Sequence, residues 1–197
     1  MPKETRSQKQ SKREQVRIQH RRRQLLIRIG LIAAAVIVVG GIVGYVINNQ
    51  RPAVVAGDRL IATEGQGHVA TDQRVNYRNN PPSSGQHYGV TAEWGYSASE
   101  IIPEVWLHNL EHGGIVFLYH CEADCPELKS SLETLAGQLP KSKYGSIKIV
   151  VTSYPDPLPG TITALAWTRQ MDLETFDADA LTNFYKRYVD RGPEDVP

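Results

Sequence analysis

The amino-acid sequence predicts an α/β (or α+β) protein. We expect a single N-terminal transmembrane helix followed by one compact extracytoplasmic domain, which has a small mixed sheet, flanking helices and a loop-rich first half. Three observations indicate this fold class: a charge-free apolar run near the N-terminus, β-branched runs that alternate with helical patterns in the second half, and a concentration of turn-forming residues between them.

Charge is distributed unevenly along the chain of 197 residues, although the net formal charge is only +1. Residues 1–28 hold ten Lys and Arg against two Glu, a net charge of +8, and the remainder has a net charge of −7. Such an asymmetry predicts that the two segments lie in different environments. The basic segment has no interleaved aromatic residues, so we predict a cytoplasmic tail that contacts anionic lipid, and no nucleic-acid partner.

The apolar run at residues 29–47, IGLIAAAVIVVGGIVGYVI, contains nineteen residues and no charge. A helix needs about 20 apolar residues to cross a bilayer. The following VINNQRPA offers no small-residue cleavage site, which predicts an uncleaved, single-pass anchor in the cell (inner) membrane. The basic flank predicts a cytoplasmic N-terminus and a domain outside the cytoplasm. Gly40 and Gly44 form a GxxxG pattern, through which two copies could pair as a homodimer.

The rest of the chain is predicted to form a tether and one domain. Residues 48–66 have no sustained periodicity and are expected to be the tether, which leaves 67–197 as the extracytoplasmic domain. Residues 75–89, VNYRNNPPSSGQHYG, are dense in Pro, Gly, Asn and Ser, which predicts turns and loops. Because binding residues are often carried on loops over a rigid scaffold, this segment is a candidate for function.

Helices and strands are predicted in the second half from periodicity and from residues that favour helix ends. Residues 100–114 favour a short helix that begins near Pro103, and residues 115–120, IVFLYH, favour a buried strand. A leucine stripe predicts a helix that ends at Pro140, and 146–154 predict a strand parallel to the first. We expect another helix from near Thr161 and a last one capped by Asp177.

Six stretches of this sequence resemble a bacterial family of membrane-anchored proteins that is catalogued as domain of unknown function 3105. They are GHV (67–69), VNY (75–77), PPSSGQHY (81–88), HNLEHGG (108–114), AWTR (166–169) and RGPE (191–194). The resemblance implies an anchor followed by this domain, and it implies no established activity. It places the motif histidines at His68, His87, His108 and His112.

These four histidines are the predicted ligands of a metal ion. In a helix, His108 and His112 would lie one turn apart on the same face, and Glu104 would extend that face. His68 and His87 could close the site from their loops, with Glu104 or Glu111 as a carboxylate ligand. Because imidazole suits zinc and copper, we predict a zinc or copper ion as the cofactor.

The two cysteines, Cys121 and Cys125, form a separate candidate site in CEADCPEL. Outside the cytoplasm we expect them to be an oxidised or readily oxidised pair. The segment is similar to the cysteine motif of thioredoxin-like copper chaperones that serve cytochrome oxidase, which implies copper transfer or thiol redox chemistry. That family has a histidine well downstream of its cysteines, whereas no histidine follows His120 in this chain.

Two other interpretations of HNLEHGG remain open from the sequence. HNLEH matches the inverted zinc-protease pattern H-x-x-E-H, with Glu111 as the base, although the glycines that follow would end the helix directly after the second histidine. Alternatively, the domain is a non-catalytic interaction or accessory module of a membrane complex, with Trp94, Tyr96 and Trp106 in a surface for other membrane or extracytoplasmic proteins. The sequence assigns no catalytic residue, so we favour a protein that is not an enzyme.

Overall fold

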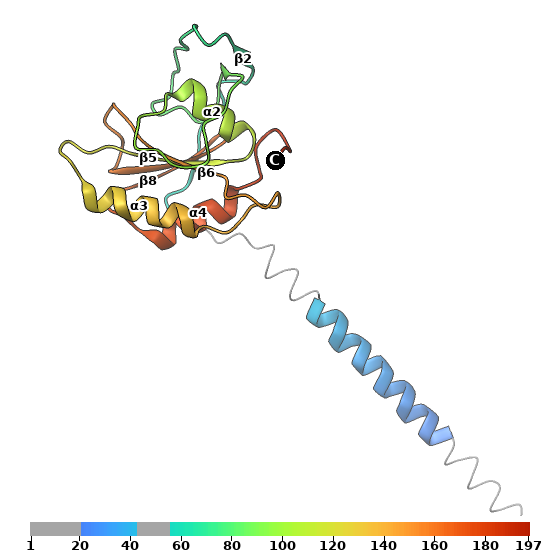
Figure 1. Cartoon of the computed structure of the whole chain (residues 1–197). Helices are drawn as coiled ribbons and strands as arrows, with labels where there is room; N and C mark the ends of the chain where they lie inside the picture. Colours follow the sequence, from blue (N-terminus) through green and yellow to red (C-terminus); the bar gives the residue numbers. More distant parts are fainter. Residues whose placement is uncertain (1–20, 43–55) are drawn as a thin grey trace, which may run out of the picture. The chain divides into compact units, whose positions relative to one another are not determined.

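The structure is a computed structural model that describes residues 21–42 and 56–197 of the chain (Figure 1). The first described part is one helix, Arg21–Ile42, of 22 residues, which is long and apolar enough to cross a membrane. It contains residues 29–42 of the predicted span. Residues 43–47 of that span, most of the basic tail, Gly44 and the first part of the predicted tether lie outside the described residues.

The second described part is a mixed α/β domain, which agrees with the predicted fold class. A six-stranded sheet has the order β1-β8-β7-β5-β6-β4, and β2 and β3 form a separate parallel pair. Within the larger sheet, β6 is parallel to β4 and β5, whereas the other pairings are antiparallel. The strands are β1 (Arg59–Leu60), β2 (His68–Val69), β3 (His87–Tyr88), β4 (Gly95–Tyr96), β5 (Ile115–Tyr119), β6 (Ile149–Ser153), β7 (Ile162–Ala166) and β8 (Arg169–Leu173).

Two helices cover one face of this sheet. Helix α3 (Pro126–Gln138) connects the parallel strands β5 and β6, and α4 (Ala178–Tyr188) follows β8. Asp177 caps α4 by accepting a hydrogen bond from the Ala180 N–H at 2.9 Å, as its sequence position predicted. The apolar faces of both helices pack on alternate residues of β5, including Ile115 and Phe117, to form the larger hydrophobic core.

Helix α2 (Pro103–Glu111) lies on the opposite face of the sheet (Figure 1). Trp106, Leu107 and Leu110 pack on Val116 and Leu118 of β5 to form a second core. Because both faces of β5 are covered, all five of its residues are buried. The loop-rich segment that contains β2 and β3 packs over α2, which places the predicted histidine motifs together on this side of the sheet.

The prediction of a helix from near Thr161 is wrong, because this segment forms the β7–β8 hairpin. Ile162, Ala164 and Ala166 face the larger core and Leu165 faces the second one. The strand is therefore buried on both faces, so its sequence lacks the regular polar alternation that distinguishes a half-exposed strand from a helix. Thr168, with a φ of 59°, turns the chain between the two strands.

The domain begins before residue 67, so the later part of the expected tether belongs to the fold. Strand β1 pairs with β8, and the Asp58 carboxylate accepts a hydrogen bond from the Tyr188 hydroxyl. Glu64 accepts hydrogen bonds from the backbone N–H groups of Arg78 and Asn79 at 2.7 and 2.9 Å. These contacts hold the segment that leads into β2, and thereby the position of His68.

Candidate metal centre

The site is assembled from three segments that lie far apart in the sequence. Strands β2 and β3 pair so that His68 lies directly beside His87, and the Gly67 carbonyl accepts a hydrogen bond from the His87 N–H at 3.0 Å. Helix α2 contributes His108 and Glu111, which are three residues apart and so share one face of the helix. The pairing register of β2 and β3 and one face of α2 therefore bring four side chains together.

His68, His87, His108 and Glu111 could hold a metal ion. Each offers one ligand atom, and these atoms all lie within 4.8 Å of one another. The Glu111 Oε2 atom lies 3.0 Å from His87 Nε2 and 3.7 Å from His68 Nε2. Four donors about 2.1 Å from a tetrahedral zinc ion would be about 3.4 Å apart, so the longest separations in the group must shorten by up to about 1.4 Å to bind one. His68, on a two-residue strand with half of its side chain exposed, is the member freest to move.

His87 is oriented toward the cluster by its own turn. Its Nδ1–H donates to the Gly85 carbonyl at 2.9 Å, because that oxygen can only accept. Gly85 has a φ of +131°, a conformation that other residues rarely adopt, and its carbonyl is the one that accepts the hydrogen bond from the ring. The fully buried imidazole therefore presents Nε2 to Glu111. Metal-binding histidines are commonly fixed in this way, through a carbonyl on the other ring nitrogen.

His108 carries an unsatisfied nitrogen in the same place. Its Nδ1 atom is buried and has no hydrogen-bond partner among the described residues, an arrangement that costs free energy unless a ligand supplies the missing interaction. Burial lowers the pKa of His108, and the neighbouring rings of His112, His87 and His68 lower it further. A neutral imidazole is the form that binds a metal ion, so burial favours the state of His108 that coordination requires.

Two residues of the predicted ligand set lie outside this group. Glu104 Oε1 accepts a hydrogen bond from the Val75 N–H at 3.0 Å and lies 3.4 Å from Arg74 Nε. His112 packs its ring against His108, with centroids 4.4 Å apart, but its Nε2 lies 3.3 Å from a carboxylate oxygen of Glu194. His112 is therefore not a member of the converging group, whereas the inverted zinc-protease pattern requires His108 and His112 to bind the same ion.

The family of the chain follows from a comparison with family models. The model described as "Protein of unknown function (DUF3105)" matches residues 68–197, about two thirds of the chain. The chain belongs to the DUF3105 family. No curated protein and no solved structure gives a significant match. In this DUF3105 domain, AWTR reaches the site as well, because the Trp167 ring lies edge-on to His87 with a centroid distance of 6.3 Å.

The C-terminal RGPE stretch of the DUF3105 domain packs against the end of HNLEHGG. The Glu194 N–H donates to the Glu111 carbonyl at 3.0 Å. A Cβ atom on Gly192 would lie 2.2 Å from that carbonyl oxygen and 2.3 Å from the Gly113 nitrogen. The C-terminal segment is thus in direct contact with the backbone of a candidate ligand.

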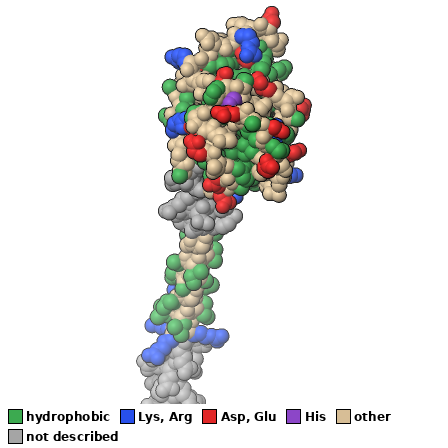
Figure 2. All heavy atoms as spheres, turned by 90° about the vertical axis from the view of Figure 1, so that its left-hand side faces the viewer, with side chains coloured by type: hydrophobic (Ala, Val, Ile, Leu, Met, Phe, Trp, Pro, Cys, Tyr) green, Lys and Arg blue, Asp and Glu red, His purple; other side chains and the backbone are tan. Residues whose placement is uncertain are grey.

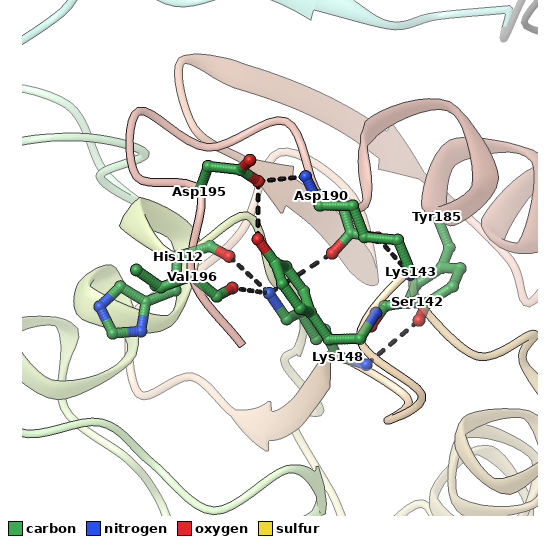
Figure 3. Close-up of polar contacts among 9 residues, drawn as sticks. His112, Ser142, Lys143, Lys148, Tyr185, Asp190, Asp195 and Val196 are labelled. Carbon is green, nitrogen blue, oxygen red and sulfur yellow. Dashed lines mark hydrogen bonds and ion pairs between the residues drawn. The ribbon is translucent and has the colours of Figure 1, made fainter.

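A buried lysine holds this C-terminal segment in place (Figure 3). Lys148, which is fully buried, donates from Nζ to the carbonyls of His112 at 3.0 Å and Val196 at 2.6 Å, and it lies 3.4 Å from Asp190 Oδ1. Sequence reasoning missed this residue. The signal that could have identified it is a single charge in the otherwise apolar run IKIVV.

The cysteines lie apart from the candidate metal centre. Cys121 and Cys125 form a disulfide with a Cα–Cα distance of 6.3 Å, between the end of β5 and the start of α3. They pack against the larger core, which is on the α3 side of the sheet. In the described part of the chain, neither belongs to a group of potential metal ligands.

Proposed function

We propose that this DUF3105 protein is a membrane-anchored, extracytoplasmic protein that binds a transition-metal ion. The ligands are His68, His87, His108 and Glu111. The observation that carries the proposal is the convergence of four potential ligand atoms within 4.8 Å, from three separate segments. Glu111 takes the place that the sequence had given to His112.

The donor set fits zinc or copper. Imidazole nitrogen suits both ions, and a carboxylate oxygen completes a four-coordinate zinc site. The fully buried His87 Nε2 faces a Glu111 carboxylate oxygen at 3.0 Å, while its Nδ1–H donates to the Gly85 carbonyl. An imidazole nitrogen and a carboxylate oxygen that face each other in this way are two ligand types that a zinc ion takes in proteins.

The bound ion would act as a cross-link in this domain. It would join β2, β3 and α2, of which β2 and β3 are only two residues long. Ligand binding to the folded state alone stabilises that state, so an ion would hold the loop-rich layer on α2. The chain supplies no residue with an assigned catalytic role, and the proposal is one of binding.

The anchor is the helix Arg21–Ile42 together with its apolar continuation in the sequence. The net charge of +8 on residues 1–28 supports a cytoplasmic N-terminus and therefore a domain on the far side of the bilayer. Protease added to intact cells or spheroplasts should digest the domain. Digestion that requires permeabilised cells would contradict this orientation.

The test of the metal site is the metal content of the purified full-length chain. Wild-type protein should retain about one zinc or copper ion per chain at micromolar free metal, measured by mass spectrometry of the elements. His87→Ala and His108→Ala should lose most of the ion. His120→Ala is the matched control, because His120 Nδ1–H donates to the Tyr154 carbonyl and the residue belongs to no potential ligand group among the described residues.

His112→Ala separates the structural ligand set from the one that the sequence suggested. We expect this variant to keep its ion, since the His112 Nε2 atom faces Glu194 and not the cluster. If wild-type protein binds no transition metal, the metal proposal fails, and a non-catalytic accessory module of a membrane complex becomes the preferred function. If His112→Ala loses the ion while Glu111→Gln retains it, the site exists with the other ligand set.

A further inference from the structure

The disulfide borders two surface hollows next to the end of β5. The larger hollow has a volume of about 780 Å³ and is bordered by both Cys121 and Cys125. The smaller one has a volume of about 360 Å³ and is bordered by Cys121 but not by Cys125. Both cysteines are partly exposed, and the three residues between them are exposed. Each hollow therefore brings solvent next to at least one cysteine of the bridge.

The walls of the hollows combine apolar and acidic side chains. Leu128, Leu158 and Phe176, together with prolines 157 and 159, supply apolar surface in the larger hollow. Carboxylates border both hollows, and the lining residues that carry a negative charge are Glu100, Glu122, Asp124, Glu127 and Glu174. Lys129 is the one lysine or arginine among the lining residues, and it is already paired with Asp124 at 2.5 Å.

Figure 2 looks onto the side of the domain where α3 begins and shows the same combination of side chains. Hydrophobic and acidic side chains lie next to one another on this face, while Lys and Arg side chains lie toward its edges. A surface of this kind attracts a molecule that is both apolar and cationic, because apolar burial and charge complementarity then act together.

We propose that Cys121–Cys125 is an exchangeable disulfide whose substrate is a cysteine in an apolar, cationic protein segment. The larger hollow receives the apolar side chains of that segment. The surrounding carboxylates select for its Lys and Arg residues. The inference is independent of the metal centre, since the disulfide packs on the other core of the domain.

The position of each cysteine determines which sulfur is attacked. Cys125 is the residue that directly precedes helix α3, whose 13 residues direct their positive dipole end toward it. This favours Cys125 as the departing thiolate. Cys121 borders the smaller hollow and Cys125 does not, so a thiolate placed there lies next to Cys121 alone. Cys121 is therefore the sulfur that forms the mixed disulfide.

The exchange balances without any further reactant. The substrate thiol loses its proton to solvent, and its thiolate attacks Cys121 Sγ. A substrate–Cys121 bond forms as the Cys121–Cys125 bond breaks, and Cys125 leaves with the electron pair. The thiolate of a second cysteine in the same substrate then attacks the substrate sulfur of the mixed disulfide. Cys121 leaves as a thiolate. The substrate dithiol is thereby oxidised to a disulfide, and the Cys121–Cys125 pair is reduced to two thiols.

The test uses the full chain in detergent and three synthetic peptides with one cysteine each. One peptide surrounds the cysteine with Lys and Leu, one with Glu and Leu, and one with Lys and Ser. After trapping of free thiols by alkylation, peptide mapping by mass spectrometry gives the rate of adduct formation and the cysteine modified. The rate of each peptide with the protein is divided by the rate of the same peptide with 2-hydroxyethyl disulfide. This ratio removes differences in the intrinsic reactivity of the peptide thiols.

We expect the Lys/Leu peptide to react about ten times faster than the Glu/Leu peptide, in line with electrostatic attraction at charged clefts, and also faster than the Lys/Ser peptide. The adduct should form on Cys121. The double substitution Glu122→Gln with Glu127→Gln should reduce the ratio of the Lys/Leu rate to the Glu/Leu rate. Glu133→Gln, which lies on α3 but borders a different hollow, should leave this ratio unchanged. Phe176→Ser should reduce the ratio of the Lys/Leu rate to the Lys/Ser rate.

Three results would overturn the proposal. The first is a bond that resists all three peptides while the reference disulfide reacts fully, which would leave the bridge a structural one. The second is equal normalised rates for the three peptides, which would remove the selectivity. The third is an adduct found on Cys125, which would contradict the assigned direction of attack. Loss of metal from His87→Ala without any change in these rates would leave this proposal intact.

Discussion

Gly192→Ala tests whether the C-terminal segment holds the candidate metal centre in shape. The new Cβ atom would lie 2.2 Å from the Glu111 carbonyl oxygen and 2.3 Å from the Gly113 nitrogen. Ordinary contacts of this kind are about 3.5 Å or longer, so the two backbones must separate by roughly 1 Å. Gly192 has no positive φ, and the penalty is therefore steric and not conformational.

The expected cost follows from what must move. Overpacking costs about 1–3 kcal/mol, and it is largest where the opposing atoms cannot rotate away. Both opposing atoms here belong to backbone that is already hydrogen-bonded, the Glu111 carbonyl to Glu194 N–H and the Gly113 N–H to the Leu110 carbonyl. We expect a loss of about 3 kcal/mol, which lowers Tm by on the order of 10 °C for a domain of this size.

Metal affinity should fall together with stability. A shift of about 1 Å in the Glu111 backbone exceeds the tolerance of roughly 0.5 Å that a preorganised site allows. Loss of such outer support typically reduces metal affinity by about 10–100-fold. Thermal unfolding and competition with a fluorescent zinc chelator measure the two effects on the full-length protein.

Gly137→Ala is the matched control for this substitution. It adds the same methyl group to helix α3, where nothing lies within 4 Å of the new atom. Because alanine favours a helix over glycine, this change should raise stability by about 0.5–1 kcal/mol and leave metal affinity unchanged. A Gly192→Ala protein with the Tm and the metal affinity of wild type would refute the argument that the C-terminal segment supports the site.

Four further predictions concern the stability of the domain. Removal of the ion with a chelator should lower Tm by several degrees, and added zinc or copper should restore it. Lys148→Met should cost about 3–5 kcal/mol in urea unfolding, because it removes the cation beside the largely buried Asp190 carboxylate and the donor to two partly buried carbonyls, while Lys141→Met at an exposed position should cost less than about 0.5 kcal/mol. Asp177→Ala should cost about 1 kcal/mol through loss of the cap on α4. The pKa values of His108 and His112 are lowered by burial, so the unfolded chain binds more protons, and the metal-free domain should lose stability as the pH falls below about 6.5, measured by thermal unfolding between pH 5 and 8.

Local patterns predicted the elements whose signals are contained in a short stretch of sequence. The continuous apolar run 115–119 is a strand, and the leucine stripe after Pro126 is helix α3, as expected. The β7–β8 hairpin was missed because β7 is buried on both faces and has no alternating pattern. Burial on two faces is a property of the tertiary structure, so a short segment taken alone could not reveal it.

Local sequence motifs also predicted part of the candidate site. Motif histidines indicated His68, His87 and His108, which the structure brings together with Glu111. The choice between Glu111 and His112 depends on the rotation of α2 against its neighbours, since both lie within about one turn of His108. That rotation is fixed by contacts distant in sequence, such as the pair of hydrogen bonds between Asn109 and the Ala92 backbone at 2.8 and 3.0 Å.

The two proposed sites occupy different layers of one domain, and this separation makes each testable alone. The candidate metal ligands lie on β2, β3 and α2, and the apolar residues of α2 belong to the core that contains Trp106. The disulfide packs on the core formed with α3 and α4. Strand β5 is shared, because its alternate residues face the two cores and its two ends lead to α2 and to Cys121. Its five residues are all buried and hydrogen-bonded to β6 or β7, so this strand is a rigid base on which a change at one site need not move the other.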